Sequence, residues 1–263
     1  FPPPNTVSFS NSVVVGFGVN SFAYIVDSGT LAAEYNGIFV TNGAMVARVG
    51  APFYNLLYDS LARWTRASSQ DVFSVSSDPL LRQPEEGDFY LRSTAGSYVP
   101  TLDSFENDAV SSPLIDAGPP TWSAATNEPA PNGSRMNIGL YGGTPSASRT
   151  PTNAFLTILS FNDGGSVSGT ETIRWVARGP ATNMLLRIDV STDGGTNFTI
   201  LTTNQLSSSG SYVWNTTTVT SSPLGVLRFI DPSTNSLLDR TDRLFAIRNT
   251  PISFYVNDTN TSG

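Results

Sequence analysis

The side chains that could carry chemistry in this chain are carboxylates, arginines and tyrosines. Histidine, cysteine and lysine are absent, and all 14 basic residues are arginines. This composition excludes Ser-His-Asp triads, cysteine nucleophiles and metal sites built on imidazole or thiolate groups. Paired carboxylates acting as acid and base, or as oxygen ligands of a cation, are the chemistry that remains.

The densest group of acids lies in the segment that follows residue 70. Its members are Asp71, Asp78, Glu85, Glu86 and Asp88. They stand among Gly, Pro and Ser residues, where an aspartate commonly closes a turn. We therefore interpret them as turn residues and assign no catalytic role to them.

Arg48 is the only base in the first fifty residues, and Asp27 and Glu34 are the only acids there. These three positions do not fall in one repeat register, so they do not form a site on one face of stacked strands. We predict that the chain has no catalytic residues and is not an enzyme.

Four aspartates are candidate cation ligands. Asp163 and Asp193 each precede Gly-Gly, which predicts hairpin turns. Asp239 and Asp242 flank one turn and could share an ion, but bonds to backbone or solvent are the better explanation, because hard cations need six or more oxygens. We predict neither a metal nor a cofactor.

The charge balance limits the partners of the chain. The formal net charge is −7, no basic run is present, and no apolar run reaches the ~18 residues of a membrane span. Nucleic acid and anionic membrane surfaces are therefore improbable partners.

The first fifty residues contain an internal repeat with an offset of 25. The matching pairs are Asn11 and Asn36, Val13 and Ile38, Val15 and Val40, and Gly18 and Gly43. Such a period is typical of a solenoid, in which each turn stacks on the next. We expect the four β-branched residues to point inward and the two asparagines to stack at a corner.

After the repeat, residues 55–67 are the best helix candidate, because Leu56, Leu57, Leu61 and Trp64 have near-helical spacing. Strands and turns follow. Residues 112–149 are rich in proline and glycine, which leaves room only for short strands, the best at 136–141.

The strings SP-L-IDAG, N-EPAPNG-R-NIG-YGG and P-AS within residues 112–149 resemble the sequence that ends the right-handed parallel β-helix in large bacterial surface and secreted proteins. Upstream matches to that family are Trp64, Gln70, Asp71, Ser74, Asp78, Pro79, Leu80, Gly87, Asp88 and Phe89. Tyr90 departs from the pattern, since relatives often have histidine there. The resemblance implies that residues 1–149 are the tail of a β-helix with a loop-rich cap.

Residues 150–154 are predicted to be a linker, and residues 155–250 contain seven strand-like runs: 155–161, 170–177, 183–191, 198–203, 210–215, 225–231 and 243–248. This spacing indicates an immunoglobulin-like β-sandwich. The strings TIRW, IDVSTDGGTNFTIL, GSYVWN and DRTDRLFAI resemble the β-sandwich domain of fungal Ser/Thr-rich cell-wall proteins and its bacterial counterparts. On this interpretation Trp175 and Trp214 are core residues.

The tail, residues 251–263, is strand-like and resembles the opening of another β-helix in the same bacterial family, so we expect it to begin a further module. An all-β chain of this kind is predicted to be a non-catalytic structural or adhesive module of a giant exported protein. Its partners would be copies of itself or adjacent modules, and cell-surface glycans, outside the cell.

The alternative is a polysaccharide-binding or polysaccharide-degrading β-helix protein. A sugar groove needs a row of exposed aromatic faces, and the candidates near the start of the chain are Phe17, Phe22, Tyr24, Tyr35 and Phe39.

Overall fold

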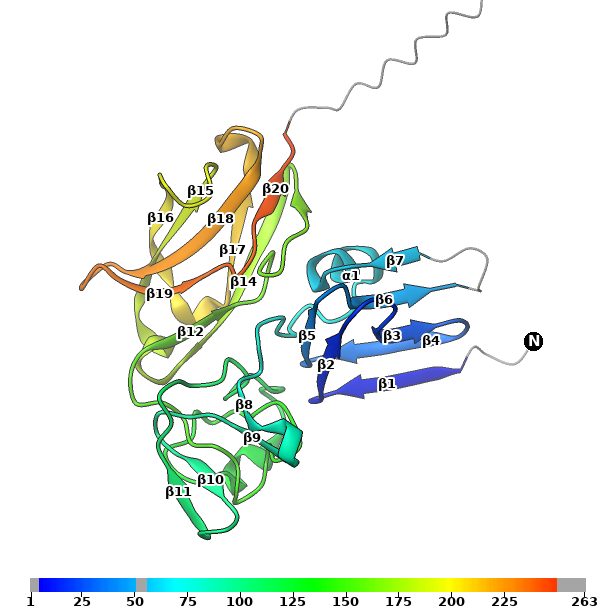
Figure 1. Ribbon diagram of the computed structural model, residues 1–263. Helices are drawn as coiled ribbons and strands as arrows, with labels where there is room; N and C mark the ends of the chain where they lie inside the picture. Colours follow the sequence, from blue (N-terminus) through cyan, green and yellow to red (C-terminus); the bar gives the residue numbers. More distant parts are fainter. Residues whose placement is uncertain (1–4, 51–55, 250–263) are drawn as a thin grey trace, which may run out of the picture.

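The computed structural model describes residues 5–50 and 56–249. The chain is mainly β-structure with one short α-helix in this range, which confirms the all-β prediction. Figure 1 shows three parts: the stacked strands β1–β6, a loop-rich part that carries β8–β11, and a part with two sheets that begins at β12.

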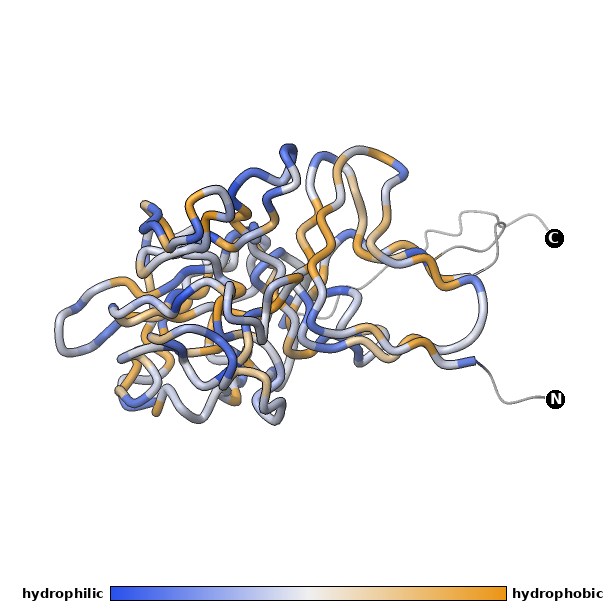
Figure 2. Tube along the Cα trace, turned by 90° about the horizontal axis from the view of Figure 1, so that it is seen from below, coloured by the Kyte–Doolittle hydropathy of each residue, from blue (hydrophilic) through white to orange (hydrophobic). Residues whose placement is uncertain are grey.

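The stacked turns are made by six strands of five residues each. They are β1 (Thr6–Ser10), β2 (Val13–Phe17), β3 (Phe22–Val26), β4 (Thr30–Glu34), β5 (Gly37–Thr41) and β6 (Met45–Val49). β1, β2 and β3 pair in parallel with β4, β5 and β6, respectively. The chain thus makes two successive turns, and Figure 2 shows apolar segments of these turns running side by side.

The observed strand register differs from the predicted repeat offset of 25 residues. Val15 lies opposite Phe39, an offset of 24 residues, and Phe22 lies opposite Met45, an offset of 23. The two β-branched pairs singled out in the sequence lie along β2 and β5 and are therefore one residue out of register.

A slip of one residue exchanges the two faces of a strand, and this explains a second error. Ile38 and Val40 do point into the core of the turns, where Val40 lies close to Gly16 of the turn before. Val13 and Val15 lie on the opposite face and line a groove.

The corner asparagines are also not equivalent to one another. Asn11, with φ of 52°, corresponds to Tyr35, with φ of 57°. Asn36 instead bonds between the turns: its Oδ1 accepts from the Ser12 amide at 3.1 Å and its Nδ2 donates to the Phe9 carbonyl at 3.0 Å. The predicted bond along the axis thus exists for one asparagine only.

One end of the stacked turns is covered by β7 (Leu56–Tyr58), antiparallel to β6, and by α1 (Leu61–Ser68). The helix prediction is correct from residue 61 on, and Trp64 is buried as the spacing requires. The helix begins there because the Ser60 side chain accepts from the Arg63 amide. Residues 56–58 are strand.

The loop-rich part contains two hairpins, β8 (Leu81–Gln83) with β9 (Asp88–Leu91) and β10 (Ser97–Val99) with β11 (Ser104–Glu106). The strand expected at residues 136–141 is absent. That segment is held by single bonds, such as the Ile138 amide to the Leu114 carbonyl at 2.9 Å. Gly139, with φ of 124°, interrupts any regular ladder.

The two-sheet part (residues 155–249) has a smaller and a larger sheet. The smaller has the order β12 (Phe155–Ile158), β14 (Thr170–Arg178), β17 (Ser211–Asn215). The larger has the order β13 (Ser166–Val167), β20 (Phe245–Ile247), β18 (Ser222–Asp231), β15 (Leu185–Ser191), β16 (Thr199–Leu206), and β19 (Ser236–Arg240) also pairs with β18. Side chains of both sheets form one core that contains Trp175 and Trp214, as predicted.

Short 3-10 segments connect these elements. They are η1 (Pro84–Glu86), η2 (Ser123–Asn127), η3 (Gly179–Asn183), η4 (Ser207–Ser209) and η5 (Thr216–Thr218). The one α-helix in the described ranges has eight residues, and none of the described helices could cross a membrane.

The predicted linker lies at a packed junction. Thr150 is buried, and its Oγ1 lies 2.8 and 3.0 Å from the two oxygens of Asp116. Arg178 of β14 donates to the Pro113 carbonyl at 2.6 Å. Burial lowers the pKa of this guanidinium to about 9. The two-sheet part is therefore bonded directly to the loop-rich part.

Candidate functional site

The first acid–base candidates do not converge. Arg48 and Asp27 form an exposed ion pair at 3.1 Å. Glu34 accepts from the Phe73 amide at 3.0 Å, and burial raises the pKa of its carboxyl. Each group already has its own partner, and the arrangement offers no shared substrate position.

Asp71 stands at a turn, as predicted, since its carbonyl accepts from the Ser74 amide at 3.1 Å, and its carboxylate is in addition a buried hub of the stacked turns. Its carboxylate accepts from Trp64 Nε1 at 3.0 Å, Asn36 Nδ2 at 3.0 Å and Ser74 Oγ at 2.6 Å. A buried charge is tolerated where several donors satisfy it. The Tyr24 hydroxyl lies 3.4 Å away. Asp71 therefore ties α1 to the second turn.

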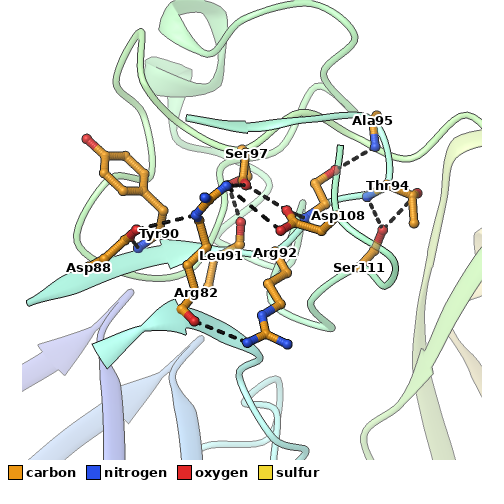
Figure 3. A network of polar contacts seen from close by, with 12 residues as sticks. Arg82, Asp88, Tyr90, Leu91, Arg92, Thr94, Ala95, Ser97, Asp108 and Ser111 are labelled. Carbon is orange, nitrogen blue, oxygen red and sulfur yellow. Dashed lines mark hydrogen bonds and ion pairs between the residues drawn. The ribbon is translucent and has the colours of Figure 1, made fainter. Parts of the chain in front are cut away.

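Asp78 does close a turn, because it accepts from the Leu80 amide at 2.9 Å. Asp88 does the same for Tyr90 at 3.1 Å and also faces Arg82 at 3.3 Å. Figure 3 shows the wider network of Arg82, in which Ser97 bridges to Asp108. Arg82 thus stands between two carboxylates and joins the two hairpins of the loop-rich part.

The two Asp-Gly-Gly segments differ. Asp193 accepts from the amides of Asn197 and Thr196, and these bonds lower its pKa to about 2. Asp163 instead accepts from the amides of Leu61 and Ala62 at the start of α1. Burial raises the pKa of the Asp163 carboxyl. The prediction that Asp163 serves only a hairpin turn is therefore wrong. Asp163 caps a helix about 100 residues earlier in the chain.

Asp239 and Asp242 do not share one position. Asp239 accepts from the Ile158 amide at 2.6 Å, and burial raises its pKa to about 7. Asp242 accepts from Ser77 Oγ at 2.7 Å and Asn162 Nδ2 at 2.8 Å. Within residues 5–50 and 56–249, no three acids gather as ligands of one ion would.

The aromatic residues proposed for a sugar groove separate into two groups. Tyr24 is buried, Tyr35 stacks on Phe73 with centroids 5.4 Å apart, and Phe22 lies beneath Arg48. Phe17 and Phe39 remain as candidates for contact with a sugar.

Those two phenylalanines line a groove of about 750 Å³. One wall is the outer face of β2 and β5. The other comes from the loop-rich part, with Phe89, Leu140 and Tyr141. Phe17 is 60% exposed, so its ring is accessible at this surface. The groove is mainly apolar and can take a hydrophobic or ring-shaped group.

Below the groove, Glu128 organises the irregular segment at 136–143. Its Oε1 accepts from the Asn137 amide at 2.8 Å and the Gly143 amide at 2.7 Å. Burial raises the pKa of Glu128 to about 7, although both amides act in the opposite direction. Sequence reasoning missed this carboxylate. Its signal in the sequence was an acid directly before prolines and glycines. Such residues favour irregular backbone, whose remaining amide groups lack ladder partners and can bind a carboxylate.

The open end of the stacked turns is a second concave surface, of about 660 Å³. Among the described residues, β1 and β3 have strand partners on one side only. Val7 is 62% and Ile25 is 56% exposed there. This end therefore combines free backbone edges with apolar side chains.

Comparisons with known protein families, with curated proteins and with solved structures found no match to this chain. The geometry therefore carries the functional argument.

Proposed function

We propose that the chain is a non-catalytic structural or adhesive module of a large exported cell-surface protein, built from the tail of a parallel β-helix and an immunoglobulin-like β-sandwich. Its stacked turns accept a further layer from a neighbouring module or a second copy. The observation that carries this proposal is the open end around Val7 and Ile25, where β1 and β3 each have one edge without a strand partner within residues 5–50 and 56–249.

Among the described strands, the side of the first turn that faces away from the second turn has no strand partner. Each strand of a parallel stack satisfies its backbone groups by pairing with the turns on both sides. β4 has β1 on one side, and the Ala33 carbonyl accepts from the Asp71 amide at 2.7 Å on the other. β1 has only β4. A further layer on β1 would pair its edge and cover Val7 and Ile25.

A head-to-tail arrangement follows if the donor strand is the tail. The expected donor, residues 251–263, lies outside the described residues. A contact between two different surfaces of the same chain repeats and gives a filament unless it closes.

The test is the mass of the particle in solution across a range of concentrations, measured by light scattering. We expect association that is lost in the double variant Val7→Lys/Ile25→Lys, because two charges would be buried at the new contact. Val213→Lys is the matched control, since Val213 is 65% exposed on β17 of the smaller sheet.

Equal masses for the chain and the double variant at every concentration would refute self-association through this end. Deleting residues 252–263 then identifies the donor. Loss of association on deletion assigns the tail, and retention assigns another surface.

Binding of polysaccharide in the 750 Å³ groove is a second candidate, favoured by Phe17, Phe39 and Phe89 along it. Phe17→Ala is expected to weaken retention on an immobilised polysaccharide. Pectin and alginate incubated with the chain should yield no unsaturated or reducing ends. Turnover that disappears in Arg48→Ala would overturn the non-catalytic assignment.

A further inference from the structure

Three arginines gather on the outer face of the larger sheet, away from the core. Along β15, Leu186, Ile188 and Val190 point into the core, so Arg187 and Asp189 face the other side. Along β18, Arg228 has the same outward orientation.

The strand register places these charges in one row. Asp189 of β15 lies opposite Arg228 of β18, and Arg228 lies opposite Arg240 of β19. Like charges directly opposite one another destabilise a sheet. The chain has a net charge of −7, so acidic residues were available for these positions. In most proteins the residue type at each position favours the fold, and exceptions such as this arginine pair are expected at functional positions.

Two of the guanidinium groups are held in place by one carboxylate. Asp189, which is buried, pairs with Arg187 Nε at 3.1 Å and with Arg228 Nε at 2.9 Å. Arg228 also lies over the ring of Phe198, 3.6 Å from its centroid. One negative charge thus positions two positive ones.

The third arginine is placed by the turn between β15 and β16. Arg240 Nη2 donates to the Gly194 carbonyl at 3.2 Å. A Cβ on Gly195, whose φ is 93°, would lie 2.7 Å from the same nitrogen. The turn therefore leaves space for this guanidinium only because glycine is present.

Together these groups line a pocket of about 270 Å³ with Phe198 and Asn235. Three guanidinium groups against one carboxylate leave an excess of two positive charges. Asp193, in the turn that holds Gly194, and Asp231, at the end of β18, accept hydrogen bonds within their own turns, from Asn197 and Ser233 respectively.

We propose that this pocket binds an oxyanion, a carboxylate, sulfate or phosphate group carried by a glycan or free in solution. Guanidinium groups pair with such groups through two parallel hydrogen bonds. A bound oxyanion would supply the charge that the Arg228–Arg240 pair lacks. The site is independent of the open end and of the apolar groove.

The experiment is an NMR titration of the full chain at constant ionic strength with three probes: inorganic phosphate, sulfate and a galacturonate oligomer. We expect saturable shifts at Phe198 and Gly195 with at least one probe. Arg240→Glu should weaken that binding at least about tenfold. The probe bound most tightly identifies the source of the oxyanion.

Arg63→Glu is the matched control, because Arg63 is an exposed arginine of α1 that pairs with Asp59 at 3.0 Å, far from this sheet face in the chain. It changes the net charge equally, and binding should stay within about twofold of the unaltered chain. Arg240→Gln, which removes the charge with little change in size, guards against misfolding of the Glu variant. Absence of saturable binding by all three probes, or equal weakening in both Glu variants, would overturn the site.

Discussion

The two-sheet part and the stacked turns bury their apolar residues in different ways. In the two-sheet part, residues of both sheets meet in one core, and Trp175, Trp214 and Phe229 are almost fully covered. In the stacked turns, Ile38 of the second turn is 1% exposed, whereas Val7, on the same face of β1 as Phe9 in the first turn, is 62% exposed.

The two parts differ because their strands find their hydrogen-bonding partners in different ways. Antiparallel strands that return on themselves find their partners within the same part of the chain. A turn of a parallel stack buries its apolar cross-section only against the next turn. The core of the two-sheet part is therefore closed by its own strands, and the first turn is where the proposed further layer would add.

The largest effect should come from opening the two-sheet core. Phe229→Ala removes a fully buried ring whose centroid lies 5.1 Å from that of Trp175. We expect the free energy of unfolding to fall by about 3–5 kcal/mol, measured by denaturant titration. Leu224→Ala, at a 43% exposed position of the same strand, is the control and should change little. Similar losses in both would contradict the assigned core.

A somewhat smaller loss is expected in the stacked turns. Asp71→Asn keeps the volume but brings an NH2 group among donors from Trp64, Asn36 and Ser74. We expect a loss of about 2–3 kcal/mol, since buried donors lose their acceptor. Hydrogen exchange should rise in β4–β6 before it rises in β15 and β18. Uniform exchange across both parts would show instead that they unfold as one unit.

Change of pH should act on buried carboxyl groups that lie outside the apolar cores. Burial raises the pKa of Glu128 and of Asp239 to about 7, and raises that of Asp116 as well. The folded chain then holds these protons more tightly than the unfolded chain. Stability should be highest near the unfolded pKa values, about 4, and should fall as pH rises through about 7.

The measurement is the melting temperature between about pH 5 and about pH 8, which we expect to decrease by a few degrees. Asp239→Asn removes one of the titrating groups and should flatten this slope. A melting temperature that rises over the same interval would contradict the assigned pKa directions.

The smallest effect is expected at the groove. Phe17 is 60% exposed, so Phe17→Ala should change the free energy of unfolding by less than about 0.5 kcal/mol. A loss above about 2 kcal/mol would mean that the ring is part of a core. The same variant serves the polysaccharide test, because its fold is expected to remain intact.

The sequence predicted the regular features of the molecule and missed those that depend on contacts between distant residues. Alternation within strands was enough to assign Trp175 and Trp214 to a core, and helical spacing was enough to place Trp64. The offset of the repeat was wrong because Asn11 and Asn36 look alike but occupy different positions around the corner.

The strands β13 and β19 were not predicted, since two residues or a polar run give no periodic signal. The arginine pocket was also missed. Its members come from β15, β18 and β19, and only the register brings them together. The burial of carboxylates such as Glu128 and Asp71 was not predicted, because it depends on how irregular loops fold around them.

The cap on α1 has a consequence for how this chain can be divided. Leu61 and Ala62 donate to Asp163, and Arg63 donates to Ser60, so one helix terminus draws on both sides of residue 150. A fragment cut at residue 149 keeps every residue of α1 and loses the acceptor for its first two amides. The domain boundary predicted from the sequence therefore differs from the position at which the chain could be cut without loss of this helix cap.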